Sequence, residues 1–316
     1  MSNNQNNHLD QLNQFNPIIS INGTITNKEN AKISVLDRGL LFGDSIYEVL
    51  MAYDSVVFLL REHLDRLWNS AEGLFMNIPI SKNELSHEII KTIKAAGNKI
   101  SYIRLMITRG EASRFGLDND FCSKGNFIII VQKHSGHSSH YYSEGVTLGF
   151  ADVIRNDVRA LNPKIKSGNY LNNFLAYMSV KNKEKGAYES IMLNSDGQVT
   201  ECSTSNIWII KNDKVFTPPT TVGILAGITR ETILKLGKKI GMEIREENFG
   251  AKDVINADEA FISSTTRIIF PATKIVSDLR DQKIGSGVPG PMTMRLLAEY
   301  RKFINEYINR YRDNDL

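Results

Sequence analysis

The stretch Asn162-Pro163-Lys164-Ile165-Lys166-Ser167-Gly168-Asn169-Tyr170-Leu171 places two lysines between a proline and a glycine. Proline and glycine disfavour helix, so we expect an extended segment that gives way to a helix near Tyr170. A lysine amine attacks a carbonyl group only when it is deprotonated, which burial or nearby cations favour. A lysine after proline is usually an exposed surface charge, but Lys166 is our candidate for a carbonyl-binding amine.

An acidic residue further along the chain complements this lysine. The stretches 190–193 and 199–200 flank the turn Asn194-Ser195-Asp196-Gly197, which predicts a hairpin that ends at Glu201. A pyridine ring that stores electrons during catalysis needs an acid partner at its nitrogen. Lys166 and Glu201 therefore suggest the two essential groups of a pyridoxal phosphate site.

The run from Lys166 to Asn173 resembles the catalytic-lysine segment of the class IV (fold type IV) pyridoxal-phosphate aminotransferases. This family includes branched-chain and D-amino-acid aminotransferases and aminodeoxychorismate lyase. Four more segments match in the same order, and the resemblance extends from about Ile19 to Lys283. It implies a two-domain fold of α+β and α/β type, similar to D-amino-acid aminotransferase, with pyridoxal 5'-phosphate as cofactor. It also implies a homodimer.

The resemblance implies a role for each matched residue. Lys166 is the catalytic residue and binds the cofactor, Tyr170 bonds the cofactor's phenolic oxygen, and Glu201 partners its ring nitrogen. The phosphate contacts fall on five residues: Arg66, Ile228, Thr229, Ser264 and Thr265. Lys164 matches no role in the family, and we expect it to be exposed.

The types of these residues suit a phosphate. Arg66 lies off the apolar stripe of an expected helix at 60–76, and a guanidinium forms bidentate, charge-assisted bonds with a phosphate. The stretch 223–230 begins with glycine and opens a helix, whose first N–H groups and dipole favour an anion. The stretch 261–266 reads as a strand that ends in hydroxyl side chains.

Four residues are expected to contact the substrate: Tyr47, Tyr102, Arg104 and Arg114. The motifs that contain them favour different substrate classes. The triplet Tyr102-Ile103-Arg104 resembles branched-chain enzymes, and strand alternation places its tyrosine and arginine on one side. This favours branched-chain L-amino acids with 2-oxoglutarate. The segment Tyr47-Glu48-Val49 is closer to D-amino-acid enzymes, yet Arg114-Phe115-Gly116 lacks their loop histidine. A D-amino-acid or (R)-amine transaminase and an aminodeoxychorismate lyase remain as alternatives.

Some positions depart from the family pattern or suggest other sites. Cys202 replaces the usual glycine after the acid, and we expect packing rather than catalysis from it. Arg267 replaces a small residue, and we expect it to add charge at the pocket mouth. His134, His137 and His140 lack a carboxylate or cysteine framework, so we expect no metal site.

Composition limits the remaining possibilities. The 316 residues are 41% hydrophobic and 23% charged, which is ordinary for a globular protein of two domains. The net charge of +3 does not favour nucleic acid as a partner. Two cysteines fit a reducing cytoplasm, and no apolar run reaches membrane-spanning length. The alternative outside enzymology is a phosphate-ligand-binding protein that kept the fold and lost the chemistry.

The expected domains follow from the pattern along the chain. An Asn/Gln-rich tail at 1–16 precedes a small α+β domain at 17–133, a Ser/Gly-rich linker at 134–145 and a large domain at 146–316 that carries the lysine. Besides 60–76, helices are expected at 82–96, 170–185 and 291–311. Strands are expected at 46–52, 100–108, 127–131 and 146–153.

Overall fold

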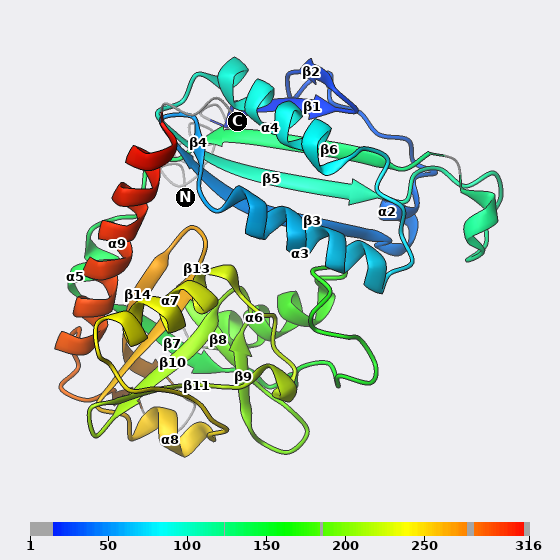
Figure 1. Ribbon diagram of the computed structural model, residues 1–316. Coiled ribbons are helices and arrows are strands. Elements are labelled where there is room, and N and C mark those ends of the chain that lie inside the picture. Colours follow the sequence, from blue (N-terminus) through cyan, green and yellow to red (C-terminus); the bar gives the residue numbers. More distant parts are fainter. Residues whose placement is uncertain (1–14, 123, 184–185, 277–280, 313–316) are drawn as a thin grey trace, which may run out of the picture. The chain divides into compact units, whose positions relative to one another are not determined.

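The computed structural model describes residues 15–122, 124–183, 186–276 and 281–312, and the chain divides into two compact units (Figure 1). The first unit contains Met1–Ser135, Lys166–Gly168 and Tyr307–Leu316, and the second contains Gly136–Ile165 and Asn169–Glu306. All but two residues of the expected tail at 1–16 lie outside the described residues.

The first unit is built on an antiparallel sheet with the strand order β2-β1-β6-β5-β3-β4. Its strands are β1 (Ile18–Ile21), β2 (Thr24–Thr26), β3 (Ser45–Tyr53), β4 (Val56–Val57), β5 (Ile100–Thr108) and β6 (Asn126–Lys133). Among the described residues, it contains the helices α2 (Arg38–Phe42), α3 (Leu60–Gly73) and α4 (Lys82–Ala96), a short 3₁₀ turn at Asn119–Phe121, and the end of α9 (Pro291–Tyr311) from Tyr307. Helices α3 and α4 cover one face of the sheet (Figure 1).

Local sequence explains why these elements begin and end where they do. Ser81 and Glu84 form a capping box at the start of α4, and Gly97 closes the helix in the left-handed conformation at φ 62°. The expected helix at 82–96 and strand at 100–108 are confirmed. Helix α3 ends at Gly73, earlier than expected, because Phe75 adopts a positive φ of 51°.

The lysine segment pairs with the free edge at the start of β3. Ile46 and Ser167 form an isolated antiparallel bridge, the N–H of Tyr47 donates to the carbonyl of Lys166 at 3.0 Å, and the N–H of Gly168 donates to the carbonyl of Ser45 at 2.7 Å. A Cβ on Gly168 would overlap Oγ of Ser45, so a larger residue would require the Ser45 side chain to move. The segment at 166–168 therefore belongs to the first unit, whereas the sequence analysis placed it in the domain at 146–316.

The second unit contains a mixed sheet with the order β12-β11-β10-β13-β14-β7-β8-β9, and β15 pairs with β14. Its strands are β7 (Val146–Phe150), β8 (Glu189–Leu193), β9 (Val199–Cys202), β10 (Asn206–Lys211), β11 (Lys214–Thr217), β12 (Ile244–Glu246), β13 (Glu259–Ser264), β14 (Ile268–Val276) and β15 (Gln282–Lys283). Its helices are α5 (His140–Ser143), α6 (Leu171–Lys183), α7 (Ile228–Lys239), α8 (Ala251–Ile255) and the part of α9 (Pro291–Tyr311) before Tyr307, with a 3₁₀ turn at Thr220–Val222.

The stretch expected as a linker at 134–145 is more ordered than its composition indicates. It contains α5, and the ring of Tyr141 stacks on Phe270 with 5.3 Å between the ring centres. Phe270 is fully buried in the core of the second unit together with strand residues such as Ile191 and Ile262. Aromatic packing therefore fixes the second half of this stretch on the sheet.

Candidate active site

Lys166 lies beside Tyr47 and Ser70 of the first unit. Its Nζ atom is 3.4 Å from the hydroxyl of Tyr47 and 4.4 Å from the centre of that ring, and its backbone N–H donates to Oγ of Ser70 at 3.1 Å. The guanidinium carbon of Arg104 lies 4.2 Å from the centre of the same Tyr47 ring. Lys166 is half-buried, whereas Lys164 is exposed as expected. The structure thus brings together the candidate nucleophile and two of the candidate substrate residues.

Arg66 is held in place by a fully buried carboxylate. Its Nε and one terminal nitrogen each lie 2.7 Å from an oxygen of Glu48, and Nδ1 of His63 lies 2.8 Å from Glu48. Burial acts to raise the pKa of Glu48, but the charge and hydrogen bonds of Arg66 and His63 outweigh it and lower the pKa to about 2. Burial lowers the pKa of His63, against the opposing effect of Glu48. The guanidinium of Arg66 therefore has a fixed orientation.

The sequence analysis did not identify Glu48 or His63 as partners of Arg66. A signal was present, because Glu48 is a charged residue within the otherwise apolar stretch 46–52. A charge buried in such a strand needs a counter-charge nearby. His63 and Arg66 lie three residues apart on α3, which places both on one face of that helix.

In the second unit, Glu201 is 6% exposed and lies in β9. One of its oxygens is 3.0 Å from a terminal nitrogen of Arg155, and the other accepts a hydrogen bond from the backbone N–H of Leu225 at 3.1 Å. The sequence analysis assigned no role to Arg155, because nothing in the local pattern links it to a strand so far along the chain. The carboxylate of Glu201 is therefore oriented by one cation and one backbone donor.

The start of α7 meets the end of β13 at this site. Gly227 is the N-cap residue, so Ile228 and Thr229 begin the helix with the N–H groups that an α-helix leaves without a partner of its own. Nδ2 of Asn206 donates to the carbonyl of Leu225 at 3.1 Å, and Asn206 also pairs with Ser263 across the strands. A Cβ on Gly227 would overlap Oδ1 of Asn206. Glycine is thus required for the close approach of this turn.

Ser264 and Thr265 follow directly at the end of β13. Both residues are half-buried, and Oγ of Ser264 is buried without a hydrogen-bond partner among the residues that the structure describes. A buried hydroxyl without a partner is costly and marks a place where a ligand atom would fit. Free helical N–H groups and this hydroxyl together suit an anion.

Tyr170 is placed on the turn that follows Glu201. Its hydroxyl donates to the carbonyl of Ser203 at 3.0 Å, and Nδ2 of Asn173 donates to the same carbonyl at 2.8 Å. Tyr170 is 38% exposed, which leaves part of its ring open to a ligand. Its bond to a cofactor oxygen stays a prediction.

The two remaining candidate substrate residues have different surroundings. Tyr102 and Arg104 are half-buried and lie two positions apart on β5, hence on one face of the sheet. Arg114 is exposed on the loop after β5, and its guanidinium carbon lies 3.5 Å from the ring centre of Phe121. Arg114 thus makes a stacking contact within its own loop.

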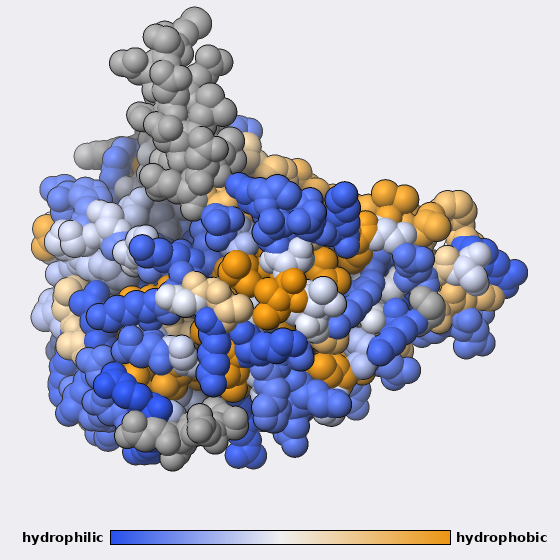
Figure 2. All heavy atoms as spheres, turned by 90° about the horizontal axis from the view of Figure 1, so that it is seen from above, coloured by the Kyte–Doolittle hydropathy of each residue, from blue (hydrophilic) through white to orange (hydrophobic). Residues whose placement is uncertain are grey.

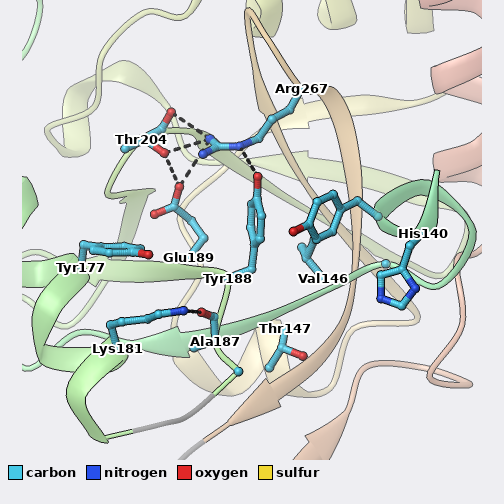
Figure 3. Close-up of a pocket in the computed structure, with 13 residues that line it drawn as sticks. His140, Val146, Thr147, Tyr177, Lys181, Ala187, Tyr188, Glu189, Thr204 and Arg267 are labelled. Carbon is cyan, nitrogen blue, oxygen red and sulfur yellow. Dashed lines mark hydrogen bonds and ion pairs between the residues drawn. The ribbon is translucent and has the colours of Figure 1, made fainter. Parts of the chain in front are cut away.

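Arg267 borders a pocket of about 600 Å³ in the second unit (Figure 3). Its guanidinium lies 3.5 Å from a carboxylate oxygen of Glu189, so its positive charge has a counter-ion within the same unit. Cys202, which replaces the glycine usual in the family, is 1% exposed and belongs to the hydrophobic core of this unit. Burial, followed by the charge of Glu189, raises the pKa of the Cys202 thiol well above its usual value, which agrees with a packing role.

Two of the three histidines of the stretch at 134–145 contact residues of the second unit. His137 packs edge-on against Phe270, and Nδ1 of His140 lies 2.9 Å from Glu144. Across the described residues, no group of three or more His, Cys, Asp or Glu side chains could hold a metal ion. In the same residues, no helix combines the length and the apolar character needed to cross a membrane.

The chain is similar to proteins of a known family. The family model described as Amino-transferase class IV matches residues 45–275. The chain is 36% identical over 283 residues to a putative branched-chain-amino-acid aminotransferase of Methanocaldococcus jannaschii, covering 90% of this chain and 95% of the relative. It is 32% identical over 280 residues to a D-alanine aminotransferase of Bacillus licheniformis, covering 87% and 93%.

Solved structures share the fold. The branched-chain amino acid aminotransferase of Escherichia coli superposes with a TM-score of 0.85 at 28% identity, covering 91% of this chain and 94% of that one. Another branched-chain enzyme, solved with pyridoxamine 5'-phosphate, has the same TM-score and identity and covers 93% and 97%. Class IV aminotransferases use pyridoxal 5'-phosphate and act on amino acids and 2-oxo acids. The chain therefore belongs to the class IV aminotransferase family, has its two-domain fold type IV architecture and is a pyridoxal-phosphate enzyme.

Proposed function

We propose that this enzyme transfers the amino group of a branched-chain L-amino acid to a 2-oxo acid such as 2-oxoglutarate, with Lys166 as the catalytic residue. The contact of Lys166 and Arg104 with the same Tyr47 ring is the observation that carries the proposal. An amine and a cation thus contact the same tyrosine ring, and a guanidinium can receive the second carboxylate of 2-oxoglutarate. The relative from Methanocaldococcus jannaschii, named as a putative branched-chain enzyme, supports the same substrate class.

The residues present fit the cofactor. The unpartnered buried hydroxyl of Ser264 and the close approach of Gly227 at the start of α7 form a place for phosphate oxygens. Arg66, whose guanidinium Glu48 orients, supplies a cation of the type that binds phosphate. We propose that the phosphate is held by Arg66, Ile228, Thr229, Ser264 and Thr265. Glu201 would partner the ring nitrogen and Tyr170 the phenolic oxygen.

Pyridoxal phosphate supplies, when bound, an aldehyde carbon that bonds to an amine and a ring that takes up an electron pair. The chain's own residues position the reacting groups and move the proton. We propose that Nζ of Lys166, once released, takes the proton from the substrate Cα atom and acts as a general base and then a general acid. The hydroxyl of Tyr47, 3.4 Å from Nζ, orients this amine. Arg155 and the N–H of Leu225 keep the carboxylate of Glu201 in one orientation.

Borohydride reduction followed by peptide mapping tests the lysine. We expect a pyridoxyl group on Lys166 in the wild-type protein and none in Lys166→Ala, which should also lose the visible absorption of the bound cofactor. Lys164→Ala is the matched control, because Lys164 lies two residues away and is exposed. A label on Lys164, or no label at all, contradicts the assignment.

A D-amino-acid transaminase is the second candidate, because the chain is also 32% identical to a D-alanine aminotransferase. The two candidate functions differ in the configuration of the amino acid at its Cα atom. The assay therefore compares L-leucine with D-alanine, each with 2-oxoglutarate. A third arm with aminodeoxychorismate detects elimination of pyruvate by a lyase. We expect L-leucine to be preferred, and Arg104→Met should raise the KM for 2-oxoglutarate more than that for leucine. No activity on leucine would refute the branched-chain assignment.

We also propose that the enzyme is a homodimer in the cytoplasm. Helix α2 and the loop after β5 lie side by side, since Arg38 donates to the carbonyl of Leu117 at 3.3 Å. Together they expose apolar side chains, among them Leu40 at 64%, Phe115 at 79% and Leu117 at 75%. Helix α2 lies at the right of Figure 1, and Figure 2 shows orange, hydrophobic side chains on the right-hand side of its view. Exposed apolar groups in such a cluster mark interaction surfaces. Both described cysteines are free thiols, in keeping with a reducing compartment.

Light scattering on purified protein tests the dimer. Leu40→Glu should shift the molar mass from two chains towards one, because a charge on this patch opposes its burial. Val288→Glu is the matched control, since Val288 is also exposed, at 62%, but lies in the second unit. A wild-type mass of one chain would contradict the proposal.

A further inference from the structure

A buried carboxylate lies directly behind the turn that follows Glu201. Glu189 in β8 is 2% exposed, and it accepts hydrogen bonds from the hydroxyls of Ser203 and Thr204. Oγ of Ser205 lies 3.4 Å from the same carboxylate. Three consecutive residues of one turn are thus bound to a single buried acid. A carboxylate so deeply buried needs a counter-charge to be tolerated.

Arg267 provides that counter-charge. One terminal nitrogen lies 3.5 Å from Glu189 and donates to the hydroxyl of Thr204 at 2.8 Å, and its Nε donates to the hydroxyl of Tyr188 at 3.0 Å (Figure 3). Burial acts to lower the pKa of Arg267, but the charge of Glu189, the interactions with Tyr188 and the nearby Cys202 together outweigh it and raise the pKa. The guanidinium is therefore charged, and two of its nitrogens are engaged by groups of the second unit.

The pair connects segments that the proposed function uses separately. Arg267 lies two residues after Thr265, at the turn between β13 and β14. The turn that it binds through Thr204 begins two residues after Glu201 and presents the carbonyl of Ser203 to Tyr170. The network of Glu189 and Arg267 thus connects three parts of the expected cofactor site. These are the turn that carries Thr265, the turn that follows Glu201, and Tyr170.

We propose that Glu189 and Arg267 are positioning residues that fix the spacing of these three segments and so set the affinity for pyridoxal phosphate. The inference rests on the proposed function, since it assumes that these segments hold the cofactor. It also assigns Arg267 to an internal counter-ion role, and not to binding of a substrate carboxylate at the pocket mouth. Their effect is exerted through Glu201, Tyr170 and Thr265, the residues that the proposed function assigns to the cofactor.

Two quantities separate positioning from simple stabilisation: the dissociation constant of pyridoxal phosphate from the apo protein, followed by tryptophan fluorescence, and the Tm of the apo protein. Arg267→Ala should raise the dissociation constant about tenfold or more, the size typical for loss of a residue that orients a ligating group. It should also lower the Tm, because Glu189 is left unpaired. The double variant Glu189→Gln/Arg267→Ala should recover much of the Tm while binding stays weak. Arg267→Lys should likewise keep the Tm and bind weakly, since an ammonium cannot bond to Tyr188 and Thr204 in the planar geometry of a guanidinium.

Arg245→Ala is the matched control, because Arg245 forms an exposed ion pair with Glu243 in the same unit. It should change neither quantity. An unchanged dissociation constant in Arg267→Ala, or binding that recovers together with the Tm in the double variant, would overturn the positioning role alone. A wild-type protein that binds no pyridoxal phosphate would overturn the proposed function as well. The ratio of activities on acidic and apolar substrates should stay the same in Arg267→Ala, and a selective loss of the acidic substrate would assign Arg267 to substrate binding.

Discussion

Glu48→Gln is the substitution whose effect follows most directly from the structure. Glu48 is fully buried, and both of its oxygens are bound by Arg66, one of them also by His63. Its pKa falls from 4.5 to about 2 on folding. At 1.36 kcal/mol per pKa unit, the ionised carboxylate contributes about 3 kcal/mol to the free energy of unfolding at neutral pH. Replacement by glutamine also leaves Arg66 without its counter-charge, so we expect a loss of about 3 to 5 kcal/mol.

The pH dependence gives a second, independent signature. Because the pKa of Glu48 is depressed in the folded state, the unfolded state binds more protons below pH 4.5, so the stabilisation is complete above that pH and is lost as the pH falls towards 2. By about pH 3 the wild-type protein should have lost about 2 kcal/mol of this contribution. His63, whose pKa is also depressed, acts with the same sign from pH 6.5 downwards. Only the part below pH 4.5 should disappear in Glu48→Gln.

Urea unfolding of the apo protein at a series of pH values measures both effects. The control is Glu72→Gln, which removes an exposed carboxylate from the same helix as His63 and Arg66. We expect the control to follow the wild-type curve. A Glu48→Gln protein with wild-type stability at neutral pH, or with the same loss of stability below pH 4.5, would refute the assignment of a buried ionised carboxylate.

Two further predictions concern the lysine segment and the thiols. Gly168→Ala should lower the stability of the apo protein by about 1 to 3 kcal/mol, because the new Cβ would overlap Oγ of Ser45. A thermal unfolding curve that does not shift would contradict the pairing of this segment with β3. Iodoacetamide should label Cys122 well before Cys202, because burial raises the pKa of the Cys202 thiol and hides it from the reagent. Mass spectrometry of a time course checks this, and equal rates would show that the Cys202 side chain is accessible.

The parts of the fold that the sequence predicted well are those with local signals. The stretch at 82–96 carries its own capping residues, Ser81 and Gly97, and its helix has the expected bounds. The stretch at 134–145 shows the opposite case, because its Ser/Gly-rich composition conceals α5. That helix is short, and Tyr141 holds it on the sheet by contact with Phe270, a residue far along the chain.

The candidate site divides in the same way. The residues of the matched segments were identifiable by type and order, and the family is confirmed. Their partners were not, because Arg155 with Glu201 and Arg267 with Glu189 are separated by 46 and 78 positions, as the numbering shows. Such pairs depend on which strands lie next to each other. Sequence periodicity indicates which face of its own helix or strand a side chain lies on. It does not indicate which residues of other elements that side chain contacts.

The discontinuous make-up of the first unit bears on how the protein is made. All the described strands of its sheet have been synthesised once Lys133 has been added. Two contacts of the unit need later parts of the chain: the start of β3 pairs with residues 166–168, and Phe58 packs against Tyr307, with 5.1 Å between the ring centres. On a ribosome, where chains emerge from the N-terminus, the first unit must remain unfinished until almost the whole chain has been translated. During that interval its unpaired strand edge is available to other chains, so slow translation through the second half would favour aggregation.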